Sequence, residues 1–163
     1  MKDLIEKEIM EAHGRYINEL LHWPEDSNLD PEAFNQEERQ AIEQACYLYV
    51  QMIIEQGINK YYLFRNIYLY RGPVKDGYGM CQPLIDGAGG IAGYRIYISN
   101  EYRFSSKQLQ AVFLHEMLHT MSRYNILPHK SMLFHACYKY LERYYELNVF
   151  NIGYAEKWED MDD

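Results

Sequence analysis

The sequence predicts an α+β fold in a single domain, residues 1–163. Apolar residues recur at helical spacing through the first 59 residues and again from residue 105 to about 147. Between these regions lie two short segments rich in aromatic and β-branched residues, which is typical of β-strands. We expect two N-terminal helices, a small and mainly antiparallel sheet, and two further helices, with residues 60–147 as the core region of the domain.

Both N-terminal helices are expected within residues 1–59. Residues 2–22 place apolar side chains at helical spacing. Asn35 is followed three residues later by Glu38, which is the pattern of a capping box. The second helix is therefore predicted to run from there to Gln56, with the following glycine as its stop.

Two strands are expected in the middle of the chain, at Tyr61–Tyr70 and Tyr94–Ser99. Residues 72–93 hold seven of the ten glycines and are predicted to be mostly loop. The glycine run Asp86–Gly93 leads into a strand and not into a helix, so a phosphate-binding loop is disfavoured. A mobile loop beside the cleft is the better interpretation.

The third helix is the most apolar one. Ser105 and Gln108 form its capping pattern, and its periodicity continues to about Tyr124. A helix that is apolar over much of its circumference is buried. Pro128 then opens a fourth helix to about residue 147, and the acidic tail at 148–163 is expected to be frayed.

The third helix carries the motif that indicates chemistry, His115-Glu116-Met117-Leu118-His119. Helix positions four apart lie only about 40° apart around the axis, so both imidazoles can reach one zinc ion. Glu116 lies beside the same face, where it can take a proton from a zinc-bound water. Two histidines and a glutamate without partners would be costly to bury in such a helix, and a metal removes that cost for the histidines.

Catalytic zinc sites usually have three protein ligands, so a third is needed. His129 is our first choice, because the start of the fourth helix can lean into a cleft. His135 and a carboxylate such as Glu142 remain alternatives. His13 and His22 belong to the first helix and are predicted to be surface residues.

The motif, the short loop after it, Pro128-His129 and Phe134 together resemble the SprT-like zinc peptidase family. The preceding segment Tyr94–Ser99 is similar to the strand that enters the zinc helix in that family, and the likeness spans roughly residues 60–145. It implies that His129 is the third zinc ligand and Glu116 the general base. It also implies that substrate lies along Tyr94–Ser99 as an edge strand, which can hold an extended peptide by main-chain hydrogen bonds.

Charge and composition bear on the partner and the cellular location. The net charge is −8, yet residues 60–140 carry 10 basic and 4 acidic side chains. No run of consecutive basic residues is present, so a nucleic-acid partner is only weakly supported. The three cysteines form no CxxC pair and are expected to be buried thiols. The N-terminal residues do not resemble a signal peptide and no apolar stretch is long enough to span a bilayer, so a cytoplasmic location is expected.

The sequence therefore favours a zinc metallopeptidase that acts on a protein or peptide. A zinc hydrolase of a non-peptide amide or ester remains an alternative, as does a binding module that uses the zinc scaffold without turnover. An oxyanion formed on the attacked carbonyl needs a hydrogen-bond donor, and Tyr94, Tyr97 and Tyr124 are the candidates nearest in sequence.

Overall fold

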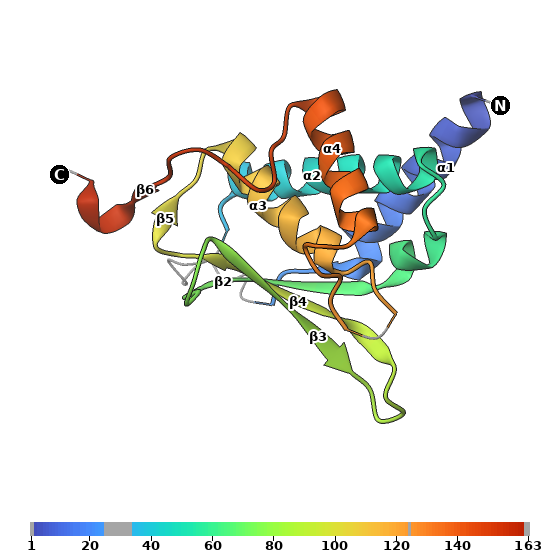
Figure 1. The fold of residues 1–163 in the computed structure, drawn as a ribbon, viewed down its shortest axis with the longest axis horizontal. Coiled ribbons are helices and arrows are strands. Elements are labelled where there is room, and N and C mark those ends of the chain that lie inside the picture. Colours follow the sequence, from blue (N-terminus) through green and yellow to red (C-terminus); the bar gives the residue numbers. More distant parts are fainter. Residues whose placement is uncertain (1, 25–33, 124, 162–163) are drawn as a thin grey trace.

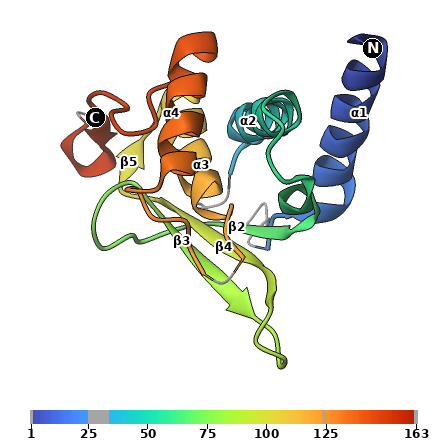
Figure 2. The ribbon, with the colours of Figure 1, turned by 45° about the vertical axis from the view of Figure 1, so that its right-hand side comes forward.

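Four helices gather on one side of a four-stranded sheet in the computed structural model (Figures 1 and 2). The structure describes residues 2–24, 34–123 and 125–161. The α-helices are α1 (Lys2–Arg15), α2 (Gln36–Glu55), α3 (Ser106–His119) and α4 (Met132–Tyr145). The predicted α+β class is thus confirmed. Across the described residues, no helix combines the length and apolar character needed to cross a bilayer.

The main sheet is mixed, in the order β1-β2-β4-β3. Its strands are β1 (Leu21–His22), β2 (Asn66–Gly72), β3 (Gly79–Ile85) and β4 (Ile91–Ser99). The expectation of a mainly antiparallel sheet is wrong, because β1 and β4 both run parallel to β2 and only the β3–β4 pair is antiparallel. The chain leaves β2, crosses to the far edge as β3, and returns by a hairpin into the central position as β4.

Two predictions for the middle of the chain need correction. The segment Tyr61–Tyr70 is not one strand, since Lys60–Phe64 form a 3₁₀-helix and β2 begins only at Asn66. Residues 72–93 are not mostly loop, because they contain all of β3. Pro83 made β3 hard to predict, because proline has no N–H to donate to a neighbouring strand. Proline is tolerated in edge strands, and β3 lies at the edge of the sheet.

The glycine run closes the β3–β4 hairpin. The carboxylate of Asp86 accepts hydrogen bonds from the backbone N–H groups of Ala88 (2.8 Å) and Gly90 (2.9 Å). Gly89 adopts a φ of 83°, a left-handed conformation that favours glycine. The glycines therefore serve a tight turn.

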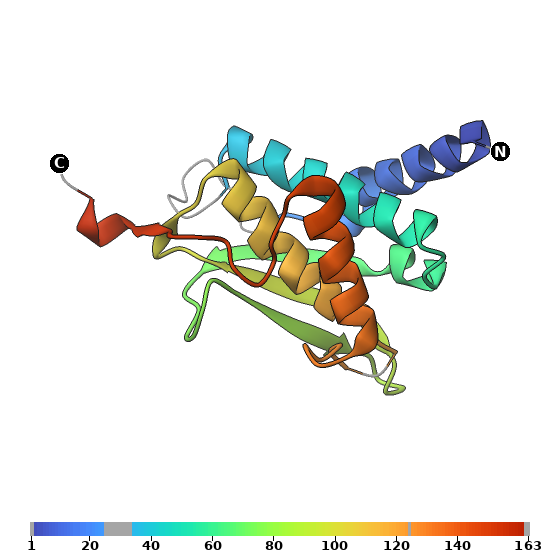
Figure 3. The ribbon, with the colours of Figure 1, turned by 45° about the horizontal axis from the view of Figure 1, so that its top comes forward.

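The core lies between the sheet and the helices. Alternate residues of β4 point to this side, so Tyr94, Ile96 and Ile98 are fully buried. Helix α3 is buried on most of its surface, as its composition predicts, and runs beside α2 with the start of α4 near its C-terminal end (Figure 3). The whole motif lies in this helix, and four of its five residues, Glu116 to His119, are buried.

Both predicted capping boxes are present, at Asn35 with Glu38 and at Ser105 with Gln108. The helix ends are less well predicted. The first helix stops at Arg15 and continues as a π-helix, Tyr16–Leu20, before β1. Helix α3 stops at His119 and not near residue 124, which lies outside the described residues.

Helix α4 begins at Met132 and not at Pro128, because the Ser131 hydroxyl accepts the N–H of Phe134 and caps it. The C-terminal segment is docked rather than frayed. Its strand β6 (Glu156–Lys157) pairs with β5 (Tyr102–Arg103), and a 3₁₀-helix, Trp158–Asp160, follows. These changes place both the loop before α4 and the segment after it against the end of α3.

Candidate metal centre

Three imidazoles converge at the C-terminal end of α3. His115 and His119 stand one turn apart with ring centroids separated by 5.1 Å, and His129 reaches them from the loop before α4. One nitrogen from each ring lies within 4.8 Å of the others. The structure thus brings together the three histidines that the sequence singled out.

The Nδ1 atoms of His115 and His119 are hydrogen-bonded to main-chain carbonyls. Nδ1 of His115 lies 2.7 Å from the carbonyl oxygen of Val149, and Nδ1 of His119 lies 2.6 Å from that of Leu127. A carbonyl only accepts, so both Nδ1 atoms carry the hydrogen. The Nε2 lone pairs of His115 and His119 are therefore directed to the centre of the cluster, as metal ligands require.

The third imidazole already lies at nearly the separation of a ligand. Nε2 of His129 is 2.9 Å from Nε2 of His115. Since the His115 hydrogen is on Nδ1, the His129 Nε2–H is the donor of this bond. Two nitrogens bound tetrahedrally to one zinc ion are about 3.3 Å apart, so the pair needs to open by only a few tenths of an ångström.

Burial keeps the two motif rings neutral. Desolvation lowers the pKa of His115 to about 4, with the carbonyl of Val149 opposing the shift. Desolvation also lowers the pKa of His119, which is 9% exposed. Only the neutral imidazole can bind a metal, so these rings are ready ligands at neutral pH.

Two phenyl rings enclose the imidazoles. The ring of Phe134, from α4, lies 5.0–5.5 Å from all three of them. Phe150, from the segment after α4, lies 5.5 Å from His115 and 5.6 Å from His129. The centre therefore has apolar walls on two sides, which fix ring orientation and limit access of water.

Glu116 follows His115 in α3 and is buried, with 6% of its surface exposed. Edge strand β3 passes directly over it, since a Cβ added to Gly79 would be 2.9 Å from Oε2 of Glu116. Only glycine fits this approach without a shift of one of the two partners. Burial raises the pKa of Glu116 to about 8, and a nearby divalent cation would lower it and keep the carboxylate ionised.

The other sequence candidates lie outside the cluster. His135 is exposed on α4, near Phe150. Glu142 accepts a hydrogen bond from the hydroxyl of Tyr138. His13 contacts the carbonyl of Glu43, and His22 contacts the side chain of Asn66; both rings are partly buried rather than on the surface.

The two described tyrosine candidates for the oxyanion, Tyr94 and Tyr97, are engaged away from the cluster. Tyr94 is buried, and its hydroxyl donates to the carbonyl of Asn125. Tyr97 stacks on Tyr70, on the sheet face away from the helices. Tyr124 lies outside the described residues. All three cysteines are buried and free, as expected.

Sequence reasoning missed several contributors to the centre. Val149 and Leu127 act through backbone carbonyls, which any residue type supplies, so no sequence signal marks them. Phe150 lies 31 residues beyond His119, in a segment expected to be frayed. The adjacent apolar residues Val149 and Phe150, in a tail with a net negative charge, were the available hint.

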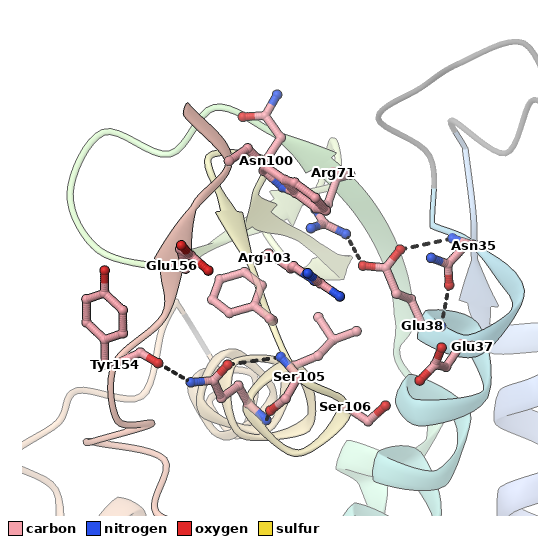
Figure 4. Close-up of a pocket in the computed structure, with 14 residues that line it drawn as sticks. Asn35, Glu37, Glu38, Arg71, Asn100, Arg103, Ser105, Ser106, Tyr154 and Glu156 are labelled. Atoms are coloured by element: carbon pink, nitrogen blue, oxygen red, sulfur yellow. Dashed lines mark hydrogen bonds and ion pairs between the residues drawn. The ribbon is translucent and has the colours of Figure 1, made fainter. Parts of the chain in front are cut away.

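A large cavity, of about 1130 Å³, lies at the other end of α3, between its N-terminus and that of α2 (Figure 4). Arg71 and Glu38 form an ion pair at one side of it, and Tyr154 and Glu156 line the opposite side. Its polar groups include both acids and bases, and none of them is a histidine. This cavity and the imidazole cluster are separate sites.

Comparison with protein-family models, with curated proteins and with solved structures finds no match to this chain. The chemistry of the centre therefore has to be judged from its own residues. These provide three imidazole nitrogens, apolar walls and a buried carboxyl group, a set that fits a zinc ion with one coordination position left for water.

Proposed function

We propose that the protein is a zinc-dependent peptidase of the SprT-like, zincin type. The observation that carries the proposal is the convergence of three imidazole nitrogens within 4.8 Å, next to the buried Glu116. His115, His119 and His129 would hold the ion. A bound zinc ion supplies Lewis-acid activation of a water molecule.

Glu116 is the proton carrier in this proposal. Its carboxylate takes a proton from the attacking water and passes it to the amine that leaves when the peptide bond breaks. The carbonyls of Val149 and Leu127 keep the two motif rings in one tautomer and orientation throughout. Phe134 and Phe150 wall the imidazoles and limit the access of water to them.

The structure changes which strand would hold the substrate. The segment Tyr94–Ser99 belongs to β4, which is paired on both sides and has no free edge. Strand β3 is the edge strand, and among the described residues it pairs only with β4. An extended peptide along β3 would use free main-chain groups and would pass beside Glu116 at Gly79.

This edge favours a peptide over a small amide or ester, because main-chain pairing recognises another main chain. Purified protein is expected to contain about one zinc ion per chain, measured by elemental analysis, and to cleave an unstructured protein. Chelation should abolish cleavage and added zinc should restore it. Hydrolysis of small amides or esters without any cleavage of peptides would favour the other hydrolase class.

A non-catalytic scaffold is the remaining alternative. Zinc binding with no cleavage of proteins, peptides, amides or esters would favour it, and a salt-dependent affinity for nucleic acid would identify its partner. The buried Glu116, next in sequence to His115, argues for turnover, since a purely structural zinc site has no use for a base. A preparation with no bound zinc would contradict the peptidase proposal.

A further inference from the structure

Arg65 is a buried cation at the C-terminal end of α3. It follows the 3₁₀-helix Lys60–Phe64 and is only 5% exposed. Its Nη1 atom donates to the carbonyl of Thr120 (2.7 Å) and to that of Ser122. Both carbonyls belong to the first residues after α3, so one side chain holds the chain where the helix ends.

A second side chain extends this contact. Nη1 of Arg65 also donates to the hydroxyl of Tyr94 (3.0 Å), and that hydroxyl donates to the carbonyl of Asn125 (2.7 Å). Arg65 and Tyr94 together therefore hold carbonyls at three positions of the loop that leaves α3. Tyr94 comes from the rigid central strand β4, which anchors the loop to the sheet.

This loop joins two of the candidate ligands. At its far end Leu127 folds back onto the motif, because its N–H donates to the carbonyl of His119 (2.9 Å) and its own carbonyl accepts the His119 Nδ1–H (2.6 Å). His129 lies two residues further along. The path of the loop therefore sets both the ring orientation of His119 and the place of His129.

An arginine suits this place better than other residues. Its charge faces the carbonyls at the negative end of α3 and the rings of Tyr61, Tyr62 and Tyr94, with its guanidinium carbon 5.2–5.5 Å from their centroids. All three of these hydrogen bonds come from Nη1, which reaches the carbonyls of Thr120 and Ser122 and the hydroxyl of Tyr94. Among the described residues its Nε atom has no hydrogen-bond partner, so stability alone gives a weak reason to bury it.

We propose that Arg65 is a positioning residue of the metal centre, which fixes the loop after α3 so that His119 and His129 stand at ligand separation before an ion arrives. This inference rests on the metal centre of the proposed function. Its role is indirect, since it touches neither the imidazoles nor the ion and acts through Thr120, Ser122 and Tyr94.

Arg71 provides a matched control. It is also a buried arginine, 6% exposed, and it donates to the backbone carbonyls of Ser99 and Tyr102 as well as to Glu38. It lies near the N-terminal end of α3, beside the cavity of Figure 4 and away from the imidazoles. Its replacement tests the loss of a buried arginine without disturbing the loop.

The experiment compares Arg65→Gln, Arg65→Lys and Arg71→Gln with the unchanged protein. Zinc affinity is measured by competition with a chelating dye, thermal stability by calorimetry, and loop order by amide hydrogen exchange of the metal-free proteins. Arg65→Gln is expected to weaken zinc binding about 10- to 100-fold, as loss of outer-shell support does, and to speed exchange between His119 and His129. Arg65→Lys should recover part of both. Arg71→Gln should lower the melting temperature and leave zinc affinity within about twofold.

Unchanged zinc affinity in a folded Arg65→Gln protein would overturn the proposal, as would an equal loss in Arg71→Gln. If Arg65→Gln does not fold, the same criteria apply to Arg65→Lys. If the unchanged protein binds no zinc, the proposed function fails. The hydrogen-exchange comparison still decides the role of Arg65 in that case, because equal loop exchange with and without the arginine would contradict it.

Discussion

The two ends of α3 differ in how they are built. At the N-terminal end, Ser105 and Gln108 cap the helix with their own side chains, next to a wide polar cavity. At the C-terminal end, the last turn is closed by residues from far along the chain, with Arg65 on one side and Val149 on the other. The first end is local in sequence and open to solvent, and the second is long-range and largely buried.

The wide cavity and the candidate metal centre do not coincide. The wide cavity offers mixed charges whose best-buried member, Arg71, is already fully engaged by Ser99, Tyr102 and Glu38. In the imidazole cluster the ring nitrogens point at one another, and two of them share a hydrogen bond. Convergent donors with an unused lone pair mark a metal site better than empty volume does.

The largest expected effect is on peptide cleavage, and it distinguishes Glu116 in α3 from Glu38 beside the wide cavity. Glu116→Gln should reduce peptide cleavage by about 10²- to 10⁴-fold, the usual contribution of a general base, with zinc still bound. Glu38→Gln, at the capped end of α2, serves as the control and should keep cleavage near the unchanged rate. Cleavage assays with parallel zinc analysis measure both. Full activity in the Glu116 variant would remove this residue from the mechanism.

The next effect concerns the third ligand. His129→Ala should weaken zinc binding by more than about 100-fold, since loss of a ligand exceeds the loss of an outer-shell partner. His135→Ala, on the exposed side of α4, should change it by less than about threefold. Titration with a chelating dye gives both affinities. The reverse order would reassign the ligand and break the proposed centre.

A smaller effect, on stability, is expected at the N-terminal end of α3. Ser105→Ala removes the hydroxyl that accepts the N–H of Gln108 and should lower the free energy of unfolding by about 1 kcal/mol. Zinc affinity should not change, because the cap lies about 15 Å along the helix from His115. Chemical denaturation and zinc titration test the two statements. Weaker zinc binding here would show that the ends of α3 are coupled.

A further effect is a pH dependence of the metal-free protein. The folded state holds a proton on Glu116 up to a pKa of about 8, whereas the unfolded chain releases it near 4.5, so this contribution to stability is lost as pH rises toward 8. His115 acts in the opposite sense, since its pKa falls from 6.5 to about 4 on folding, and its stability contribution is lost as pH falls through that window.

Above pH 6.5 the contribution of Glu116 is therefore the one that changes. Denaturation of the metal-free protein should show stability declining from pH 6.5 to 8. Glu116→Gln has no titrating carboxyl at this position, so its curve should lack that part of the decline. Identical slopes for the two proteins would mean that Glu116 is ionised even without a metal.

Several features follow from residues close together in the chain, and these could be predicted. The capping boxes at Asn35 and Ser105 and the strand at Tyr94–Ser99 were all visible as local patterns. So was the placing of His115 and His119 on one face of a buried helix. Caps, helix faces and strand alternation depend on neighbours within about four residues, which the sequence displays directly.

The tertiary structure alone decided the rest. It made the sheet mixed, turned the glycine-rich stretch around Gly79 into the edge strand over Glu116, and brought the carbonyls of Leu127 and Val149 to the motif rings. It also brought Arg65 into hydrogen-bonding contact with Thr120 at the end of α3, 55 residues further along the chain. Strand order and backbone acceptors carry no mark of residue type, so these partners are fixed only when distant segments pack together.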